Sequence, residues 1–355
     1  MKKRYSIATA TAFLAASIST GTVVAQASFQ DHRGQQIELD APPERLVTIV
    51  RSAPIIYRAV DETGDNIAGM NKDSLDRYFT SGIYTEIIPE MSKLNATAAR
   101  EGFVPNVEAI LEMNPDLVVQ WIYDPKIIEP LERVGLKVVG WDCCTEQHRR
   151  DYLTLSGHIA GKPERAAMLL GLQDGSAQAL TDRMSGVSQD SFASVLQIDQ
   201  LNDQIRVIAN GSQDFSASGV VNLAADDSGE WWKTVDLEQV FAWDPQIILI
   251  PPYATDLTPD SFYSNPILAT LQAVRDRRVY KMPAFGRTPD APEIYLTSPW
   301  VAVVAHGSQS APDFRVAVAD GYQAIYGATL SDAQIAGILE LDQNSVSAGY
   351  VETFD

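Results

Sequence analysis

Arginine and aromatic side chains gather near the ends of short apolar runs in this chain. The run 46–50 is followed by Arg51 and Ser52, and the run 247–250 is followed within three residues by Tyr253. Aromatic faces and guanidinium planes suit a bulky, conjugated and often anionic molecule. The candidate ligand contacts are Arg51, Ser52, Trp121, Tyr123, Trp141, Trp231, Trp232, Tyr253, Phe285 and Arg287. These residue types predict non-covalent binding of a ligand.

Patterns typical of catalysis or metal binding are missing from the sequence. It has no G-x-S-x-G, H-E-x-x-H, C-x-x-C, P-loop or G-x-G-x-x-G motif. Its four histidines, at 32, 148, 158 and 306, are not spaced as a ligand pair. We therefore expect no metal site, no cofactor and no enzymatic activity. The one enzymatic alternative is a cell-envelope enzyme that uses Cys143 as a nucleophile.

The two cysteines of the chain are adjacent, at Cys143 and Cys144. In an oxidising compartment they could form a strained vicinal disulfide or stay a pair of buried thiols. Neither state would hold the fold together, because so small a ring constrains almost none of the unfolded chain.

The elements that must position the candidate site alternate between strands and helices. The runs 46–50, 117–121, 137–141, 194–198, 247–250 and 278–280 indicate buried strands, and helical patterns lie between them. This alternation predicts an α/β fold. In such folds ligands bind at the carboxyl ends of the strands, and most of the candidate residues stand there. The exceptions are Trp231 and Trp232, which stand just before the helical pattern that begins at 236.

The segment 106–119 has a counterpart at 236–249. Each begins with a residue suited to cap a helix, carries a glutamate two positions later, and reaches a proline two residues before an apolar run. The repeat predicts two lobes built on one plan. Between them, 163–187 has apolar residues at helical spacing after a proline that suits a first helical turn. We therefore predict lobes over 28–162 and 188–355, joined by one helix over 163–187.

The start of the chain is typical of a secretory signal peptide over 1–27. Lys2, Lys3 and Arg4 precede an apolar stretch over 7–18, and Ala25-Gln26-Ala27 forms a small-x-small cleavage site. The chain has 46 acidic against 27 basic residues and a formal net charge of −19. This charge opposes binding to nucleic acids or anionic membrane surfaces. We expect a periplasmic protein without a membrane anchor.

Several segments resemble the helical-backbone periplasmic binding proteins of ABC importers, which serve ferric siderophores, haem and vitamin B12. The segments 106–119 and 236–249 are similar to the two repeated signatures of that family. The other residues that carry the resemblance are Asp31, Gly34, Ile37, Leu39, Pro43, Arg45, Leu46, Val47, Asn265, Pro266, Leu271, Ala273, Val274, Arg278, Val279, Tyr280, Tyr322, Ile325, Tyr326 and Gly327. The likeness covers nearly all of the chain after residue 27.

The resemblance implies two lobes, each with a mostly parallel sheet and flanking helices, joined by one long helix with the ligand between them. It also implies that Glu108 and Glu238 project from the surface and pair with arginines of the transporter's permease subunits. Trp232 aligns with an aromatic residue that lines the cleft in the vitamin B12 carrier.

On these grounds we predict the periplasmic substrate-binding component of an ABC importer. We expect a monomer that captures a ferric-siderophore-type chelate between its lobes and delivers it to the membrane permease. The alternatives are an oxyanion such as molybdate or tungstate, haem, and cobalamin.

Overall fold

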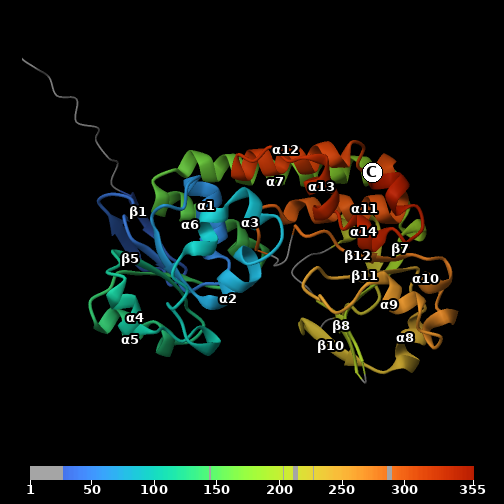
Figure 1. Ribbon diagram of the computed structural model, residues 1–355, viewed down its shortest axis with the longest axis horizontal. Helices are drawn as coiled ribbons and strands as arrows, with labels where there is room; N and C mark the ends of the chain where they lie inside the picture. Colours follow the sequence, from blue (N-terminus) through green and yellow to red (C-terminus); the bar gives the residue numbers. More distant parts are fainter. Residues whose placement is uncertain (1–26, 144, 203, 211–214, 227, 286–289) are drawn as a thin grey trace, which may run out of the picture.

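The computed structural model describes residues 27–143, 145–202, 204–210, 215–226, 228–285 and 290–355. The chain forms two lobes, and the helix α7 (Pro163–Met184) runs along one side of the molecule from one lobe to the other (Figure 1). We call the lobe around the first sheet the N-lobe and the other the C-lobe. The predicted α/β class, with two lobes and one long connecting helix, is confirmed. The predicted signal peptide, apart from its last residue, lies outside the described residues.

The N-lobe is built on a fully parallel sheet in the order β4-β3-β5-β6. These strands are β3 (Leu46–Thr48), β4 (Ile67–Met70), β5 (Leu117–Trp121) and β6 (Val138–Trp141). An antiparallel pair, β1 (Ala27–Gln30) and β2 (Gln36–Leu39), precedes them. The helices are α1 (Ala53–Asp61), α2 (Lys72–Ser74), α3 (Tyr84–Ile87), α4 (Val107–Glu112), α5 (Glu129–Arg133) and α6 (Glu146–Ala160).

The C-lobe sheet has the order β10-β8-β7-β11-β12, with β9 paired to β7. Its strands are β7 (Ala193–Leu201), β8 (Ile205–Ile208), β9 (Val220–Asn222), β10 (Trp232–Val235), β11 (Ile247–Ile250) and β12 (Val279–Lys281). Strands β8 and β10 run antiparallel to their neighbours, and the other pairs are parallel. The helices are α8 (Leu237–Trp243), α9 (Pro259–Tyr263), α10 (Gln272–Arg275), α11 (Thr297–His306), α12 (Phe314–Tyr326), α13 (Asp332–Ile338), α14 (Leu341–Asn344) and α15 (Tyr350–Phe354).

The repeat seen in the sequence corresponds to a repeat in the backbone. In the N-lobe α4 leads into β5, and in the C-lobe α8 leads into β11. Asn114 and Asp244, which precede the two prolines, both adopt a positive φ, of 46° and 40°. The caps differ, because Asp236 accepts a hydrogen bond from the backbone N–H of Gln239 at 2.8 Å, whereas the side chain of Asn106 makes no capping bond.

The connecting helix α7 begins at the predicted Pro163 and ends at Met184, three residues before the predicted Val187. Its 22 residues span about 33 Å. The C-terminal helix α12 lies beside α7 and also contacts α1 of the N-lobe (Figure 1). Arg165 of α7 donates to the carbonyls of Ala324 and Ile325 in α12. The C-terminal helix α12 therefore helps to join the lobes. The predicted lobe boundaries, 28–162 and 188–355, stay a proposal.

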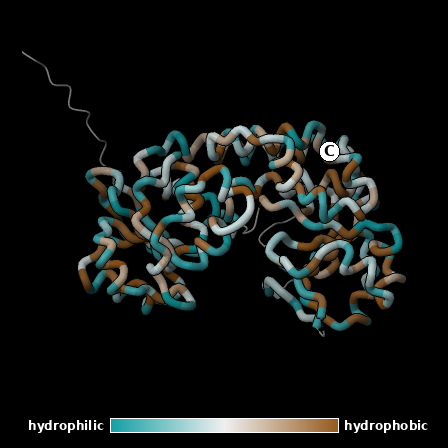
Figure 2. Tube along the Cα trace, in the orientation of Figure 1, coloured by the Kyte–Doolittle hydropathy of each residue, from teal (hydrophilic) through white to brown (hydrophobic). Residues whose placement is uncertain are grey.

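Apolar segments gather inside each lobe (Figure 2). The largest buried cluster contains side chains of the N-lobe sheet, α6, α7 and α12, so it crosses from one lobe to the other. Two further clusters fill the opposite faces of the sheets, one in each lobe. None of the helices in the described part of the chain has the length and apolar character needed to cross a membrane.

Candidate functional site

A group of polar and aromatic side chains stands at the carboxyl ends of β7 and β11 in the C-lobe. The buried carboxylate of Asp199 accepts two hydrogen bonds from the guanidinium of Arg206, at 2.8 and 3.0 Å. Tyr253 donates to the same carboxylate at 3.4 Å. The guanidinium carbon of Arg206 lies 5.7 Å from the ring centroid of Trp232, which is 47% exposed. We call these four residues the C-lobe platform.

The arginine and the tyrosine of the C-lobe platform each keep one charge state at physiological pH. The hydrogen bonds from Arg206 to Asp199 raise the pKa of the guanidinium further, and burial raises the pKa of the Tyr253 phenol. Arg206 therefore stays charged and Tyr253 stays neutral at physiological pH. A planar cation beside an exposed aromatic face is an arrangement that can hold a planar anion.

A second group lies in the N-lobe around Arg51. Arg51 forms an ion pair with Asp73, and Arg77 contacts the same carboxylate at 3.2 Å. The guanidinium carbon of Arg51 lies 5.3 Å from the centroid of Phe103. The hydroxyl of Tyr123 donates to the carbonyl of Gly102 at 3.4 Å, which places Tyr123 beside this group. Helix α2 and strand β10 lie on the sides of the two lobes that face each other (Figure 1).

Four of the predicted contacts are buried in the lobe cores. Ser52 and Trp141 are at most 1% exposed, as is Phe285, and Trp121 is 7% exposed. The ring of Trp141 stacks on Tyr152 of α6 with centroids 4.6 Å apart. Such side chains support the wall of a site and need a rearrangement to reach a ligand.

The other predicted contacts keep exposed surface or lie outside the described residues. Tyr123 is 56% exposed, whereas Trp231 and Tyr253 are half-buried. The rings of Trp231 and Trp232 lie 5.5 Å apart, so the two tryptophans contact each other. Arg287 lies outside the described residues. The structure therefore brings Trp231, Trp232 and Tyr253 together in one lobe, and Arg51 and Tyr123 together in the other.

A cavity of about 350 Å³ lies where the lobes meet. It is lined by α6 of the N-lobe, by α7, and by segments of the C-lobe that include Asp290 and Ser298. Burial raises the pKa of the Asp290 carboxyl, and the positive charges of Arg149 and Arg51 act against that rise. Asp290 thus brings an acidic group of the C-lobe within electrostatic range of two N-lobe arginines.

Two histidines from different elements lie beside the loop that follows β6, which contains Cys143: His32 stands between β1 and β2, and His148 stands in α6. The backbone N–H of Asp142 donates to Nδ1 of His32 at 2.7 Å, and the rings of His32 and His148 lie 5.0 Å apart. Burial and the charge of His148 lower the pKa of His32. Cys143 is exposed and disulfide-bonded. Cys144, the one other cysteine of the chain, lies outside the described residues.

The two glutamates assigned to transporter docking occupy equivalent places in the lobes. Glu108 lies in the first turn of α4 and Glu238 in the first turn of α8, and both are exposed. Within the described residues neither carboxylate forms an ion pair. Helices α4 and α8 both lie on the side of the molecule away from α7 (Figure 1).

Several residues of these groups were not among the predicted contacts. Arg206 stands on the antiparallel strand β8, and Phe103 ends the 3-10 helix Glu101–Phe103 that precedes α4. Neither residue follows the carboxyl end of a parallel strand, so the strand-end rule could not nominate them. One feature of the sequence could have located Arg206: Asp199 and Arg206 carry opposite charges on either side of a short turn between two strands. In the described part of the chain, no cluster of three or more His, Cys, Asp or Glu side chains could hold a metal ion.

Comparison with known proteins identifies the family. Residues 84–284 match the profile of a family described as periplasmic binding protein. The chain belongs to this family. Periplasmic binding proteins are substrate-binding transport proteins that serve ABC importers, and they are not a class of enzymes. Membership supports a periplasmic location, whereas the cleavage of the signal peptide stays a prediction.

Named relatives of this periplasmic binding protein differ in ligand. The molybdate-binding protein MolA of Haemophilus influenzae is 22% identical over 271 residues, covering 68% of this chain and 75% of MolA. A vitamin B12-binding protein of Vibrio cholerae is 24% identical over 222 residues, covering 60% of this chain and 72% of the relative. The crystal structure of a periplasmic solute-binding protein from Veillonella parvula superposes with a TM-score of 0.81 at 24% identity, covering 90% of this chain and 99% of that chain. These likenesses support the fold and leave the ligand open.

Proposed function

We propose that this periplasmic binding protein captures a ferric-siderophore-type chelate between its lobes and delivers it to the permease of an ABC importer. The observation that carries the proposal is the C-lobe platform, where Arg206 lies beside the exposed face of Trp232. A second cation–aromatic pair, Arg51 and Phe103, belongs to the opposite lobe. Two such pairs suit a large, conjugated, negatively charged chelate better than a small apolar one.

An oxyanion is the second candidate ligand. It is favoured by the similarity to MolA, whose name records molybdate binding. A small oxyanion would be held by arginines and backbone N–H groups and would leave most of the Trp232 face unused. The two ligands therefore differ in how much their binding depends on Trp232.

Delivery to the permease is proposed to use Glu108 and Glu238. Their exposure on equivalent helices supports a pair of contacts, one from each lobe. Exposed charge pairs orient a transient complex and speed its formation more than they tighten it. The substrate-binding step and the docking step are thus assigned to different surfaces.

The test is calorimetric titration of the chain without its predicted signal peptide. The titrants are ferric catecholate, hydroxamate and carboxylate chelates, haem, cobalamin and molybdate. Saturable binding of one ferric chelate per chain, lost or weakened in Trp232→Ala, is the expected result. If the protein bound molybdate and none of the chelates, and bound it equally well in Trp232→Ala, the ligand would be an oxyanion and the chelate proposal would be wrong.

A further inference from the structure

Helix α4 carries an exposed leucine beside one of the two docking glutamates. Leu111 is 46% exposed and stands three positions after Glu108. Residues three apart are neighbours on the surface of a helix, so the leucine and the carboxylate form one patch. The adjoining Ile110 and Met113 are buried in the N-lobe, whereas Leu111 belongs to no apolar cluster of the described residues. Packing within the fold therefore does not account for Leu111.

The C-lobe repeats this arrangement in α8. A glutamate, a buried aliphatic residue and a large apolar residue stand at 238, 240 and 241, as they do at 108, 110 and 111 in α4. Phe241 is half-buried against the apolar cluster of the C-lobe. We call Glu108 with Leu111 the N-lobe patch, and Glu238 with Phe241 the C-lobe patch. The N-lobe patch offers more apolar surface to a partner, because Leu111 is not packed and Phe241 is.

The carboxylates of the two patches are open to a basic partner. Glu108 and Glu238 are exposed, and among the described residues neither has an ion-pair partner. An exposed ion pair contributes little, because water and salt screen it. Apolar neighbours that the partner covers exclude water from such a pair and strengthen it. A leucine beside the carboxylate thus supplies what an exposed carboxylate lacks.

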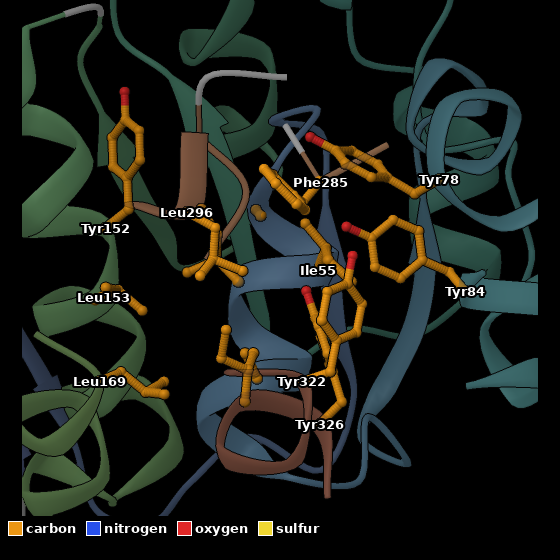
Figure 3. Close-up of a cluster of buried hydrophobic side chains, with 14 of the residues drawn as sticks. Ile55, Tyr78, Tyr84, Tyr152, Leu153, Leu169, Phe285, Leu296, Tyr322 and Tyr326 are labelled. Carbon is orange, nitrogen blue, oxygen red and sulfur yellow. The ribbon is translucent and has the colours of Figure 1, made fainter. Parts of the chain in front are cut away.

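A core that the lobes share holds the two patches at a fixed separation. Figure 3 shows Ile55 and Tyr84 of the N-lobe in one buried cluster with Phe285 of the C-lobe. Tyr84 also donates a hydrogen bond to Oε1 of the buried Glu293, and Tyr326 of α12 donates to Oε2 at 2.6 Å. Close-packed interiors do not deform continuously. One partner can therefore meet α4 and α8, which both lie on the side away from α7, without reshaping the protein (Figure 1).

We propose that the N-lobe patch is the stronger of two contacts with the permease of the ABC importer. Leu111 covers apolar surface of the permease, and Glu108 receives a basic side chain within that surface. The C-lobe patch makes a contact of the same kind with less apolar burial. The family supplies the partner, because periplasmic binding proteins serve ABC importers. This inference rests on the docking role proposed for the two glutamates and adds the apolar contact to it.

The dissociation constant for the cognate importer, reconstituted in lipid nanodiscs, tests the N-lobe patch. Fluorescently labelled protein without its predicted signal peptide is titrated at low and at high salt, with no ligand added. Leu111→Ser is expected to raise the dissociation constant about tenfold at both salt concentrations, because salt does not screen apolar burial. Glu108→Gln is expected to raise it mainly at low salt.

Two further variants separate docking from folding. Met168→Ser removes a 42% exposed apolar side chain from α7, on the opposite side of the molecule, and should bind as wild type does. Leu111→Met keeps an apolar side chain and should retain the wild-type dissociation constant. Leu111→Ser should keep a urea midpoint of unfolding close to the wild-type value, because Leu111 is not part of a core.

The outcomes distinguish this inference from the docking role on which it rests. If Glu108→Gln weakens docking while Leu111→Ser binds like wild type or like Met168→Ser, the apolar contact is wrong and the docking glutamates stand. If Glu108→Gln and Glu238→Gln both bind the importer as wild type does, the docking role is wrong and the N-lobe patch with it.

Discussion

Arg206 lies over the exposed ring of Trp232, with its guanidinium carbon 5.7 Å from the ring centroid. Two hydrogen bonds to the buried Asp199 fix the plane of that guanidinium. Neither residue depends on the ligand for its position, so the surface is formed before binding. A preformed surface reduces the conformational entropy that a ligand must overcome.

Removal of the Trp232 ring should weaken binding of a ferric chelate. Trp232→Ala is expected to cost about 1–3 kcal/mol of binding free energy, as expected for an aromatic anchor. Trp232→Phe keeps an aromatic face and should retain most of the affinity. Calorimetric titration of both variants checks this. Equal dissociation constants for wild type and Trp232→Ala would show that Trp232 does not contact the ligand.

Neutralising Arg51 should lower the affinity for an anionic ligand with little effect on stability. Asp73 keeps Arg77 as a partner, and exposed ion pairs contribute about 0–1 kcal/mol. Arg51→Gln should therefore reduce both the affinity and its dependence on salt.

The matched control for Arg51 is Arg133→Gln, which removes an exposed arginine from an ion pair with Glu129 far from the site. The measurement is the dissociation constant at low and at high salt. Identical behaviour of the two variants would show that Arg51 does not face the ligand.

The docking glutamates should separate uptake from binding. Glu108→Gln combined with Glu238→Gln is expected to leave the dissociation constant unchanged and to abolish uptake in cells that carry the cognate importer. Glu112→Gln, exposed in the same helix as Glu108, is the control and should support normal uptake. Loss of ligand affinity in the double variant would contradict the docking role.

His32 should make the fold sensitive to mild acid. Because the pKa of His32 is lowered in the folded chain, the unfolded chain takes up its proton near the ordinary value of 6.5 while the folded chain resists it. The stabilising contribution is therefore present above pH 6.5 and decreases as the pH falls below it. Protonation at Nδ1 would also remove the acceptor of the Asp142 N–H.

Urea denaturation at pH 7.5 and pH 5.5 measures this effect. His32→Asn replaces the imidazole by a side chain that accepts a hydrogen bond and does not titrate. It should show a smaller loss of unfolding free energy on acidification than wild type does. The same loss in both proteins would exclude His32 as the source.

The two-lobed fold could be predicted because its signals are local. Apolar runs, helix-ending prolines and the repeat at 106–119 and 236–249 depend on residues close in sequence. The left-handed residues Asn114 and Asp244 show that the repeat extends to backbone conformation. The missing capping bond at Asn106 was not predictable, because the residue type permits a cap without requiring one.

The site was predicted only in part, because strand ends locate a region without saying which way a side chain points. Trp141 stands at the end of β6 as expected, but α6 covers it and Tyr152 stacks on it. Arg206 and Phe103 reach the site from an antiparallel strand and a 3-10 helix, whose placement depends on contacts distant in sequence. Sequence periodicity contains no information on such contacts.

If both lobes hold a ferric chelate, substitutions in either lobe must raise its dissociation constant. The chelate is titrated against wild type, Arg51→Gln, Trp232→Ala and the double variant. We expect tight binding by wild type, weaker binding by each single variant and the weakest binding by the double variant. Failure of wild type to bind any ferric chelate, or weakening by changes in one lobe alone, would contradict it.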